Sequence, residues 1–323
     1  MEISEQVAQL YNAAIKHQAS DIYFLPVNDY YLIKIRNAEL LMIWDKVKNE
    51  QARRMINYCK YMANMALSES RRPQIGSMTW QADHKQYSLR LSSVGDFLGA
   101  ESMVIRIIYE LQDVKTAFFN QQALFELQEL TGHRGLIVFS GPTGSGKTTT
   151  IYNLVNQIAA DQVVMTIEDP VEIKQLNYLQ LQVNREAGMD YSDLIKVGLR
   201  HRPDIFIIGE IRDSLTAQAA IKAALSGHLV YSTIHAQDPC GVISRLKQLG
   251  IEEQFIFQSL TAIGYQRLIP TINGGKRALL KAHSLHELTR IKSYDWSDWQ
   301  GELERAISKR QITRETAKKY WYG

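Results

Sequence analysis

Hydrophobic and polar positions over the first third of the chain follow patterns that predict a small α+β domain. Helical periodicity covers residues 4–17 and 50–66. Alternating apolar and polar residues predict strands in five segments, which are 21–24, 31–35, 77–80, 87–92 and 103–108. Polar residues over 110–115 interrupt the pattern, so we expect this domain to occupy residues 1–112.

The remaining chain, residues 113–323, alternates buried strands with amphipathic helices. Four apolar runs predict the strands, at 135–140, 162–167, 204–208 and 228–235. Apolar strands separated by helices are typical of a mostly parallel sheet that is covered on both faces. The pattern therefore predicts an α/β domain, followed after Pro270 by a less regular region rich in aromatic residues. For those aromatic side chains we favour packing of short helices over an interaction surface.

Length and composition limit the classes of protein that fit. A chain of 323 residues is too long for one ordinary core, which agrees with two domains. Hydrophobic residues make up 45% and charged residues 22%, as in soluble globular proteins, and no apolar run is long enough to span a bilayer. The first residues lack a basic region followed by an apolar one, so we expect no signal peptide and a cytoplasmic location.

Cysteines and net charge exclude two further kinds of site. Cys59 and Cys240 do not form a C-x-x-C pair, so a four-cysteine zinc site is excluded and disulfides are not expected. The formal charge of +3 falls short of the dense positive stripe of a dedicated nucleic-acid binder. We therefore expect no direct DNA binding.

The most informative segment, residues 141–148, matches the pattern G-x-x-x-x-G-K-[ST] between a buried strand and an amphipathic helix. Such a loop turns backbone N–H groups inward around a triphosphate, and its Lys and Thr reach the β/γ-phosphates and Mg²⁺. The pattern predicts that Lys147 contacts the phosphates of ATP and that Thr148 binds Mg²⁺. We expect the nucleotide-binding residues to be Gly141, Thr143, Gly144, Ser145, Gly146, Lys147, Thr148 and Thr149.

Carboxylates follow two of the predicted strands. Glu168 and Asp169 come directly after the strand at 162–167, and Glu210 comes after the following strand. Phosphate and metal chemistry takes place at the carboxyl ends of parallel strands in such sheets. Phosphate-loop enzymes usually carry an aspartate just before the glutamate, but this position is Gly209. We therefore expect Glu168 or Asp169 to support Mg²⁺, which leaves Glu210 to orient or deprotonate the attacking water.

Two histidines lie at opposite ends of the predicted strand 228–235. A strand histidine usually makes structural hydrogen bonds in the core. Because His235 lies beside the acidic segments, we favour a catalytic role for it, and we favour such a role less for His228. In the alternative interpretation, Glu210 and Asp169 are solvated loop acids, but two acidic clusters beside one phosphate loop argue against it.

In this order, the motifs resemble those of the secretion ATPase superfamily, which drives type II secretion, type IV pili and competence pseudopili. Residues 166–172 (TIEDPVE) resemble its aspartate box, and residues 209–213 (GEIRD) resemble its atypical Walker B segment. Residues 227–236 (GHLVYSTIHA) resemble its histidine box. The resemblance extends over residues 20–268.

The resemblance implies a RecA-like P-loop ATPase domain with a C-terminal helical tail. Lys147 and Glu210 would then be catalytic, and His235 would sense or position the γ-phosphate. Arg90 and Arg106, on predicted strands of the small domain, stand where similar family members place arginines near the nucleotide. A guanidinium there neutralises charge that develops on the γ-phosphoryl group. Without the resemblance, the sequence fits equally well with two solvated surface arginines. It also leaves open whether they act on the nucleotide of their own chain or on that of a neighbouring subunit.

Within the superfamily, the sequence differs from two subgroups and resembles a third in one segment. These features favour the competence-pilus ATPases of Gram-positive bacteria. The long extra N-terminal domain and the four-cysteine insert of pilus-extension and secretion ATPases are not found, nor is the C-terminal AIRNL motif of retraction ATPases. Residues 199–204 (LRHRPD) are similar to the competence members. This assignment implies a homohexameric motor that assembles a pseudopilus for DNA uptake. It also implies a polytopic membrane platform protein as partner, with peripheral association at the inner face of the membrane.

Other functional classes fit these observations less well. Pilus-retraction and type II secretion ATPases use the same motifs, so they remain the nearest alternatives. A hexameric nucleic-acid translocase would need a basic or aromatic lining, and no cluster of Lys and Arg is dense enough. A scaffold that binds ATP without turnover is disfavoured by the intact Lys147, Thr148 and Glu210.

Overall fold

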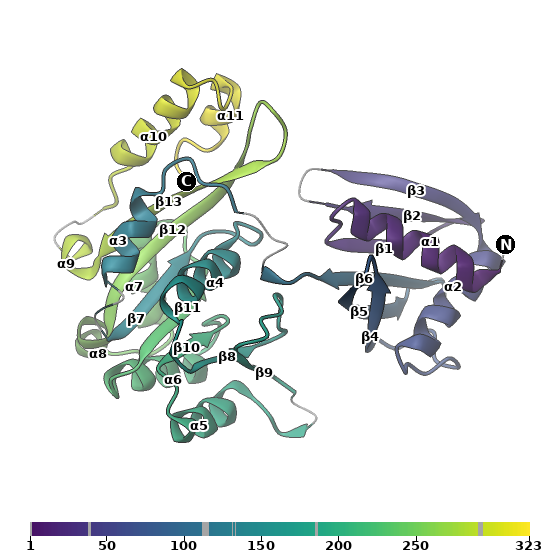
Figure 1. Cartoon of the computed structure of the whole chain (residues 1–323), viewed down its shortest axis with the longest axis horizontal. Helices are drawn as coiled ribbons and strands as arrows, with labels where there is room; N and C mark the ends of the chain where they lie inside the picture. Colours follow the sequence, from purple (N-terminus) through teal and green to yellow (C-terminus); the bar gives the residue numbers. More distant parts are fainter. Residues whose placement is uncertain are drawn as a thin grey trace. The chain divides into compact units, whose positions relative to one another are not determined.

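The computed structural model describes residues 2–37, 40–111, 116–130, 132, 134–184, 187–289 and 293–323 (Figure 1). The chain forms two compact units, Met1–Tyr109 and Glu110–Gly323. The boundary that the sequence suggests, at residue 112, lies outside the described residues. None of the helices in these ranges is long and apolar enough to cross a bilayer.

The first unit is an antiparallel sheet of six strands with two helices packed against it. The strands lie in the order β3-β2-β1-β6-β5-β4, and alternate strand residues share one hydrophobic core with the helices. The sequence does not predict β3, because its apolar residues at 41–44 do not alternate with polar ones; most of its side chains are exposed. The elements are α1 (Ile3–Lys16), β1 (Asp21–Val27), β2 (Tyr30–Arg36), β3 (Leu41–Lys48), α2 (Asn49–Met62), β4 (Gln74–Ala82), β5 (Lys85–Gly95) and β6 (Glu101–Ile108).

The second unit is built on a seven-stranded sheet in the order β13-β12-β7-β11-β10-β8-β9. Its strands pair in parallel except for β12 and β13, which form an antiparallel pair. The four strands that the apolar runs predict are its central strands β7, β11, β10 and β8. The strands are β7 (Gly135–Ser140), β8 (Val164–Glu168), β9 (Leu179–Gln182), β10 (Ile205–Ile208), β11 (Leu229–Ile234), β12 (Leu260–Pro270) and β13 (Lys276–Ser284).

Helices cover both faces of this sheet, as the predicted α/β pattern requires. Side chains of α3 and α4 pack in one buried cluster, and those of α5 to α8 pack in another, with alternate residues of β7 contributing to each. Asp190, Asp213 and Asp238 begin α5, α6 and α7, because each carboxylate accepts a hydrogen bond from a first-turn amide. The helices are α3 (Gln122–Leu130), α4 (Lys147–Ile158), α5 (Tyr191–His201), α6 (Ser214–Leu225), α7 (Pro239–Gln248), α8 (Glu253–Ser259), α9 (Leu285–Leu288), α10 (Ser297–Ser308) and α11 (Arg314–Lys319).

The last helices, α10 and α11, share a buried cluster rich in aromatic side chains with β12 and β13. Tyr265 of β12 makes edge-on ring contacts with Trp296 and Trp299, at centroid distances of 5.5 Å. The Trp299 indole is fully buried and donates a hydrogen bond to the Tyr320 carbonyl. These aromatic residues therefore pack short helices, the role that the sequence favoured for them.

Candidate active site

Four neighbouring parallel strands of the second unit end at one edge of the sheet. Ser140, the last residue of β7, lies opposite Ile234, the last residue of β11, and β10 and β8 follow in the same direction. The phosphate loop follows β7, His235 follows β11, Glu210 follows β10 and Asp169 follows β8. Segments that are far apart in the sequence therefore meet at the edge where such sheets place their ligands.

The phosphate loop takes a backbone conformation that depends on its glycines. Gly141, Gly144 and Gly146 have φ angles of +136°, +74° and +82°. A Cβ atom on Gly141 would lie 2.2 Å from the Gln266 carbonyl oxygen. Helix α4 begins directly after Gly146, and none of the described side chains caps its first amides. Uncapped amides at a helix N-terminus favour an anion, so the loop and α4 form a fitting site for phosphate.

Lys147 lies folded over the start of its own loop. Its ammonium donates hydrogen bonds of 2.9 Å to the carbonyl oxygens of Gly141 and Pro142, and the residue is 8% exposed. Burial lowers the pKa of Lys147, while the carboxylates of Glu210 and Glu172 act in the opposite direction. A cation that burial disfavours gains by contact with an anion, which is what a bound triphosphate would supply.

The hydroxyl-bearing residues of the loop differ in their surroundings. Ser145 is buried, and its hydroxyl is among the buried polar groups that have no hydrogen-bond partner in the described part of the chain. Thr148 and Thr149 are half-buried at the start of α4, and Thr143 is exposed. A buried hydroxyl without a partner costs free energy, so the site fits a ligand with many acceptor oxygens.

Glu210 is held between two side chains and through one of them reaches the phosphate loop. Its Oε2 accepts a 2.7 Å hydrogen bond from Arg212 Nε, and its Oε1 lies 3.0 Å from His235 Nε2. The other ring nitrogen of His235 lies 3.1 Å from the Gly141 carbonyl oxygen. Both ring nitrogens thus face oxygen atoms. This chain of contacts connects the predicted water-activating carboxylate to the first residue of the phosphate loop.

Glu168 and Asp169 are adjacent in sequence but differ in environment. Glu168 is 2% exposed, and its Oε1 accepts hydrogen bonds from the hydroxyls of Tyr152 (2.6 Å) and Thr166 (2.8 Å). Burial raises the pKa of Glu168, although these hydrogen bonds partly oppose the shift. Asp169 is half-buried, in the loop after β8. Of the two carboxylates, Glu168 is thus already engaged within the protein.

Gly209 stands where phosphate-loop enzymes usually carry an aspartate, and the packing explains its lack of a side chain. A Cβ at this position would lie 3.3 Å from both the Glu168 Cγ and the Tyr191 hydroxyl. Such contacts are tighter than usual, so a larger side chain would have to displace one of these groups. The buried Glu168 side chain therefore occupies space next to the position of the missing aspartate.

The residues present fit Mg²⁺ that is held chiefly by the nucleotide. In the described ranges, no three His, Cys, Asp or Glu side chains gather into a metal site. Mg²⁺ commonly keeps several waters and binds one or two protein oxygens together with substrate phosphates. Thr148 and one carboxylate after β8 match that donor set.

The sequence matches the family described as type II/IV secretion system protein over residues 2–306. The chain belongs to this family. It is 45% identical to the competence protein ComGA of Streptococcus pneumoniae over 268 residues, which cover 83% of this chain and 85% of the relative. It is 38% identical to ComGA of Bacillus subtilis, with 83% and 77% of the two chains covered. The resemblance to the secretion ATPase superfamily, with competence members among the similar relatives, is confirmed.

Other members of the type II/IV secretion family and solved structures extend the comparison. Type II secretion system protein E of Dickeya dadantii is 35% identical, over 80% of this chain and 53% of the relative. The ATPase DotB of Legionella pneumophila has a TM-score of 0.76 at 19% identity, with 97% and 94% of the chains covered. The pilus retraction motor PilT, solved with bound ADP, has a TM-score of 0.70 at 23% identity, with 96% and 95% covered. The expected RecA-like P-loop ATPase fold is confirmed.

The arginines proposed for this family member lie in the first unit. Arg90 of β5 and Arg106 of β6 are directly opposite each other in the antiparallel pair. Arg106 Nε donates a 3.0 Å hydrogen bond to Asp21 Oδ1, and its side chain is 52% exposed while that of Asp21 is 8% exposed. Arg106 is thus an exposed side chain that is ion-paired within the first unit.

Three further side chains of the second unit have defined places near the site or in the core. His228 has the structural role that is usual for a strand histidine, since its Nδ1 lies 3.2 Å from the Ala223 carbonyl oxygen and its ring packs edge-on against Phe206. Gln266 of β12 and Tyr152 of α4 are buried and hydrogen-bonded to site residues. The only local signal for Gln266 is a polar residue directly after the apolar and aromatic residues 262–265.

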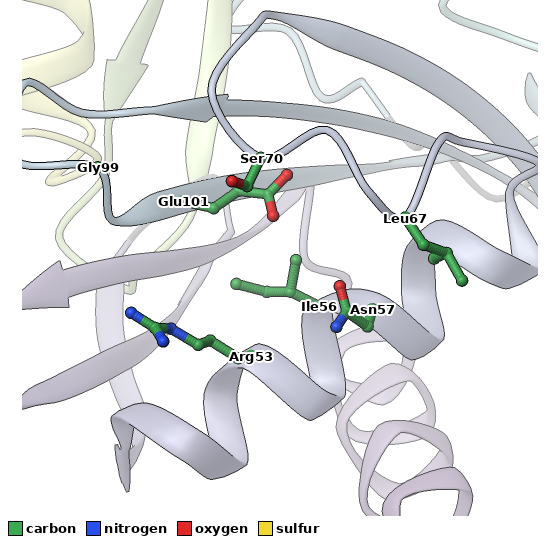
Figure 2. Close-up of a pocket in the computed structure, with 7 residues that line it drawn as sticks. All are labelled: Arg53, Ile56, Asn57, Leu67, Ser70, Gly99 and Glu101. Atoms are coloured by element: carbon green, nitrogen blue, oxygen red, sulfur yellow. The ribbon is translucent and has the colours of Figure 1, made fainter.

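A cavity of about 270 Å³ lies in the first unit (Figure 2). Glu101, one of its lining residues, forms an ion pair with the buried Lys60, in which the ammonium and carboxylate are 2.8 Å apart. The cavity is lined by Arg53, Ile56, Asn57, Leu67, Ser70, Gly99 and Glu101. None of these residues belongs to the family motifs, so the cavity is separate from the predicted chemistry.

Proposed function

We propose that this chain is the motor subunit of a competence pseudopilus or a related type IV pilus-like filament. In this proposal it hydrolyses ATP as a homohexamer and assembles the filament for DNA uptake. The protein is an ATPase, as its family and its phosphate loop indicate. The proposal rests on the contacts from Glu210 through His235 to Gly141, in a chain that is 45% identical to a competence protein.

ATP binding uses groups that already surround the loop. Lys147 exchanges the carbonyls of Gly141 and Pro142 for the β- and γ-phosphate oxygens, whose negative charge offsets the cost of burying the ammonium. Backbone amides of the loop and of the first turn of α4 donate to the phosphates. The Ser145 hydroxyl gains an acceptor, and Thr148 and Thr149, half-buried at the start of α4, supply two further hydroxyls.

Hydrolysis depends on Glu210 and its two partners. The Glu210 carboxylate orients and deprotonates the water that attacks the γ-phosphate. Arg212 and His235 keep its two oxygens in fixed places, at 2.7 Å and 3.0 Å. Because His235 also contacts the Gly141 carbonyl, movement of the phosphate loop is transmitted to Glu210. His235 thereby senses the state of the γ-phosphate.

We expect the neighbouring carboxylates of Glu168 and Asp169 to differ in whether they bind Mg²⁺. Bound Mg²⁺ neutralises charge on the triphosphate and on the leaving group. We assign its protein contacts to Thr148 and Asp169 rather than to Glu168, because Tyr152 and Thr166 already hold the Glu168 carboxylate. Glu168 then orders the end of β8 so that Asp169 faces the site.

Assembly and location follow from the same proposal. A heterologous interface that closes by rotation gives a ring, and six subunits of this chain would form the motor. Its partner would be a polytopic platform protein of the filament machinery, with the motor on the cytoplasmic side and outside the bilayer. Arg90 and Arg106 would add positive charge near the γ-phosphate when the ring is loaded with ATP. Direct DNA binding is not part of this proposal.

A genetic experiment tests which filament is driven. The gene is deleted, and DNA uptake, protein secretion and surface motility are scored side by side, with complementation by the wild-type gene. We expect loss of DNA uptake alone. The Glu210→Gln variant should fail to complement, whereas the matched control Glu129→Gln, at an exposed position of α3, should complement fully. Loss of secretion or motility with intact DNA uptake would reassign the motor to a secretion or retraction system.

A biochemical experiment tests the site itself. Lys147→Ala should lose tight ATP binding, because it removes the cation nearest the β/γ-phosphates. Glu210→Gln should retain ATP binding and lose turnover by at least about a hundredfold, because an amide keeps the shape but not the base. Binding is measured with a fluorescent ATP analogue and turnover by phosphate release. Near-native affinity in folded Lys147→Ala would refute the site assignment.

A further inference from the structure

Gln266 is a buried amide that bridges β12, the phosphate loop and helix α4. The residue is fully buried. Its Nε2 donates a 2.7 Å hydrogen bond to the Ser145 carbonyl, and its Oε1 accepts a 2.8 Å hydrogen bond from the Thr150 hydroxyl. One carboxamide thus donates to a carbonyl of the loop and accepts from a hydroxyl on the first turn of the helix that follows the loop.

The backbone and side chain of Gln266 also lie against both ends of the loop. Its carbonyl oxygen lies 2.2 Å from the place that a Cβ on Gly141 would take, and its Nε2 lies 3.0 Å from the corresponding place on Gly146. Two glycines of the phosphate loop are therefore required in part by this single residue.

The hydrogen bond to the Ser145 carbonyl fixes the direction of one peptide group. In a trans peptide the C=O and the following N–H point in opposite directions. Gln266 holds the Ser145 carbonyl towards β12, so the N–H of Gly146 points away from β12 and into the loop. If this peptide turned over, a carbonyl oxygen would face the triphosphate and repel it. A loop that binds phosphate through inward amides gains from having this peptide fixed before ATP arrives.

We propose that Gln266 is a positioning residue of the nucleotide site, which sets the peptide between Ser145 and Gly146 and the first turn of α4 for phosphate binding. The proposal rests on the nucleotide site described under the proposed function. It assigns to β12 a direct part in ATP affinity. Gln266 touches neither the substrate nor the reacting atoms, so its effect is on binding more than on the chemical step.

Three variants separate the two hydrogen bonds. Gln266→Leu removes both and keeps the approximate volume. Gln266→Glu keeps an acceptor for Thr150 but places a carboxylate against the Ser145 carbonyl. Thr150→Val removes only the bond from the helix. We expect Gln266→Leu and Gln266→Glu to raise the KM for ATP about tenfold with kcat within about twofold, and Thr150→Val to have a smaller effect.

A matched control separates positioning from loss of a buried hydrogen bond in general. The Ser259 hydroxyl, buried at the end of α8, donates to the Phe255 carbonyl away from the loop. Ser259→Ala should lower the melting temperature as much as Thr150→Val does and leave the KM for ATP unchanged. Binding of a fluorescent ATP analogue, measured on the full chain, gives a second readout that does not depend on turnover.

The outcomes distinguish this proposal from the assignment of the site. Lys147→Ala serves as the reference for a lost site. If the wild-type chain binds the analogue, Lys147→Ala does not, and folded Gln266→Leu binds as tightly as the wild type, the positioning role is overturned while the site stands. If kcat falls and KM is unchanged in Gln266→Leu, the role in phosphate binding is likewise wrong. If the wild-type chain binds no nucleotide, both the site and the positioning role are refuted.

Discussion

At the scale of single residues, Glu168 and Asp169 give the most direct test of the site. We expect Glu168→Gln to retain most ATPase activity, because an amide oxygen at this position still accepts from Tyr152 and Thr166. Asp169→Asn should lose most activity and need more Mg²⁺, because a neutral amide is a weaker ligand for a hard cation. ATPase rates are measured over a range of Mg²⁺ concentrations. The opposite ranking of the two variants would move metal support to Glu168.

The pKa of Glu168 also makes a prediction about stability. Burial raises this pKa above the usual glutamate value of 4.5, so the folded state keeps a proton that the unfolded state releases. The stabilising contribution is complete below the unfolded pKa and is lost as pH rises through the folded pKa. Denaturant unfolding of Glu168→Gln and wild type should therefore give a difference that favours the variant increasingly above pH 4.5. A difference that is constant with pH would show that this carboxyl has no raised pKa.

At the scale of elements, the two turns of the phosphate loop should differ in their tolerance of a side chain. In nucleotide-free protein, Gly144→Ala should cost about 1 kcal/mol, because its Cβ meets no described atom within 4 Å and only the left-handed φ is unfavourable. Gly141→Ala should cost clearly more, because its Cβ would overlap the Gln266 carbonyl. Melting temperatures of the two variants check this order. Equal losses would mean that β12 does not constrain the loop.

The sequence predicts the central elements well and the peripheral ones poorly, for physical reasons. Strands β7, β8, β10 and β11 are buried on both faces, so each appears as an apolar run. Strand β3 has four apolar residues at 41–44, but they do not alternate with polar ones, so it is not predicted, and in the structure most of its side chains are exposed. Motif residues were found because phosphate chemistry fixes their spacing. Gln266 was missed because its role depends on the register that pairs Tyr265 of β12 with Ser140 of β7, which no local pattern contains.

At the scale of the whole molecule, the first prediction is that the chain assembles into a six-membered ring. The purified chain should form hexamers, and more completely with a non-hydrolysable ATP analogue, because nucleotide at a subunit boundary adds contacts. Light scattering with and without the analogue measures the mass. Lys147→Ala is the matched control, since it should respond little to the analogue. If the chain is a monomer at every concentration, with and without nucleotide, the proposal of a hexameric motor is wrong.

The second prediction at this scale is that Arg106 of the first unit takes part in ATP hydrolysis. Arg106 is exposed and held by Asp21, so it is available to exchange that partner for a phosphate. We expect Arg106→Ala to keep ATP binding and the hexamer and to lose turnover, because phosphoryl transfer depends on neutralising charge in the transition state. Arg54→Ala, at an exposed position of α2, is the matched control and should turn over ATP normally.

Mixing subunits shows which chain donates the arginine. Arg106→Ala and Glu210→Gln subunits are each inactive in this scheme, and they are combined in equal amounts. If the arginine acts across a boundary, about a quarter of the boundaries in a random ring regain both groups, and activity returns in that proportion. If it acts within one chain, no subunit has both groups and the mixture stays inactive. We expect the second result, with the two units of one chain closing on its own nucleotide. Recovery of activity in the mixed ring would assign Arg106 to the neighbouring subunit's site.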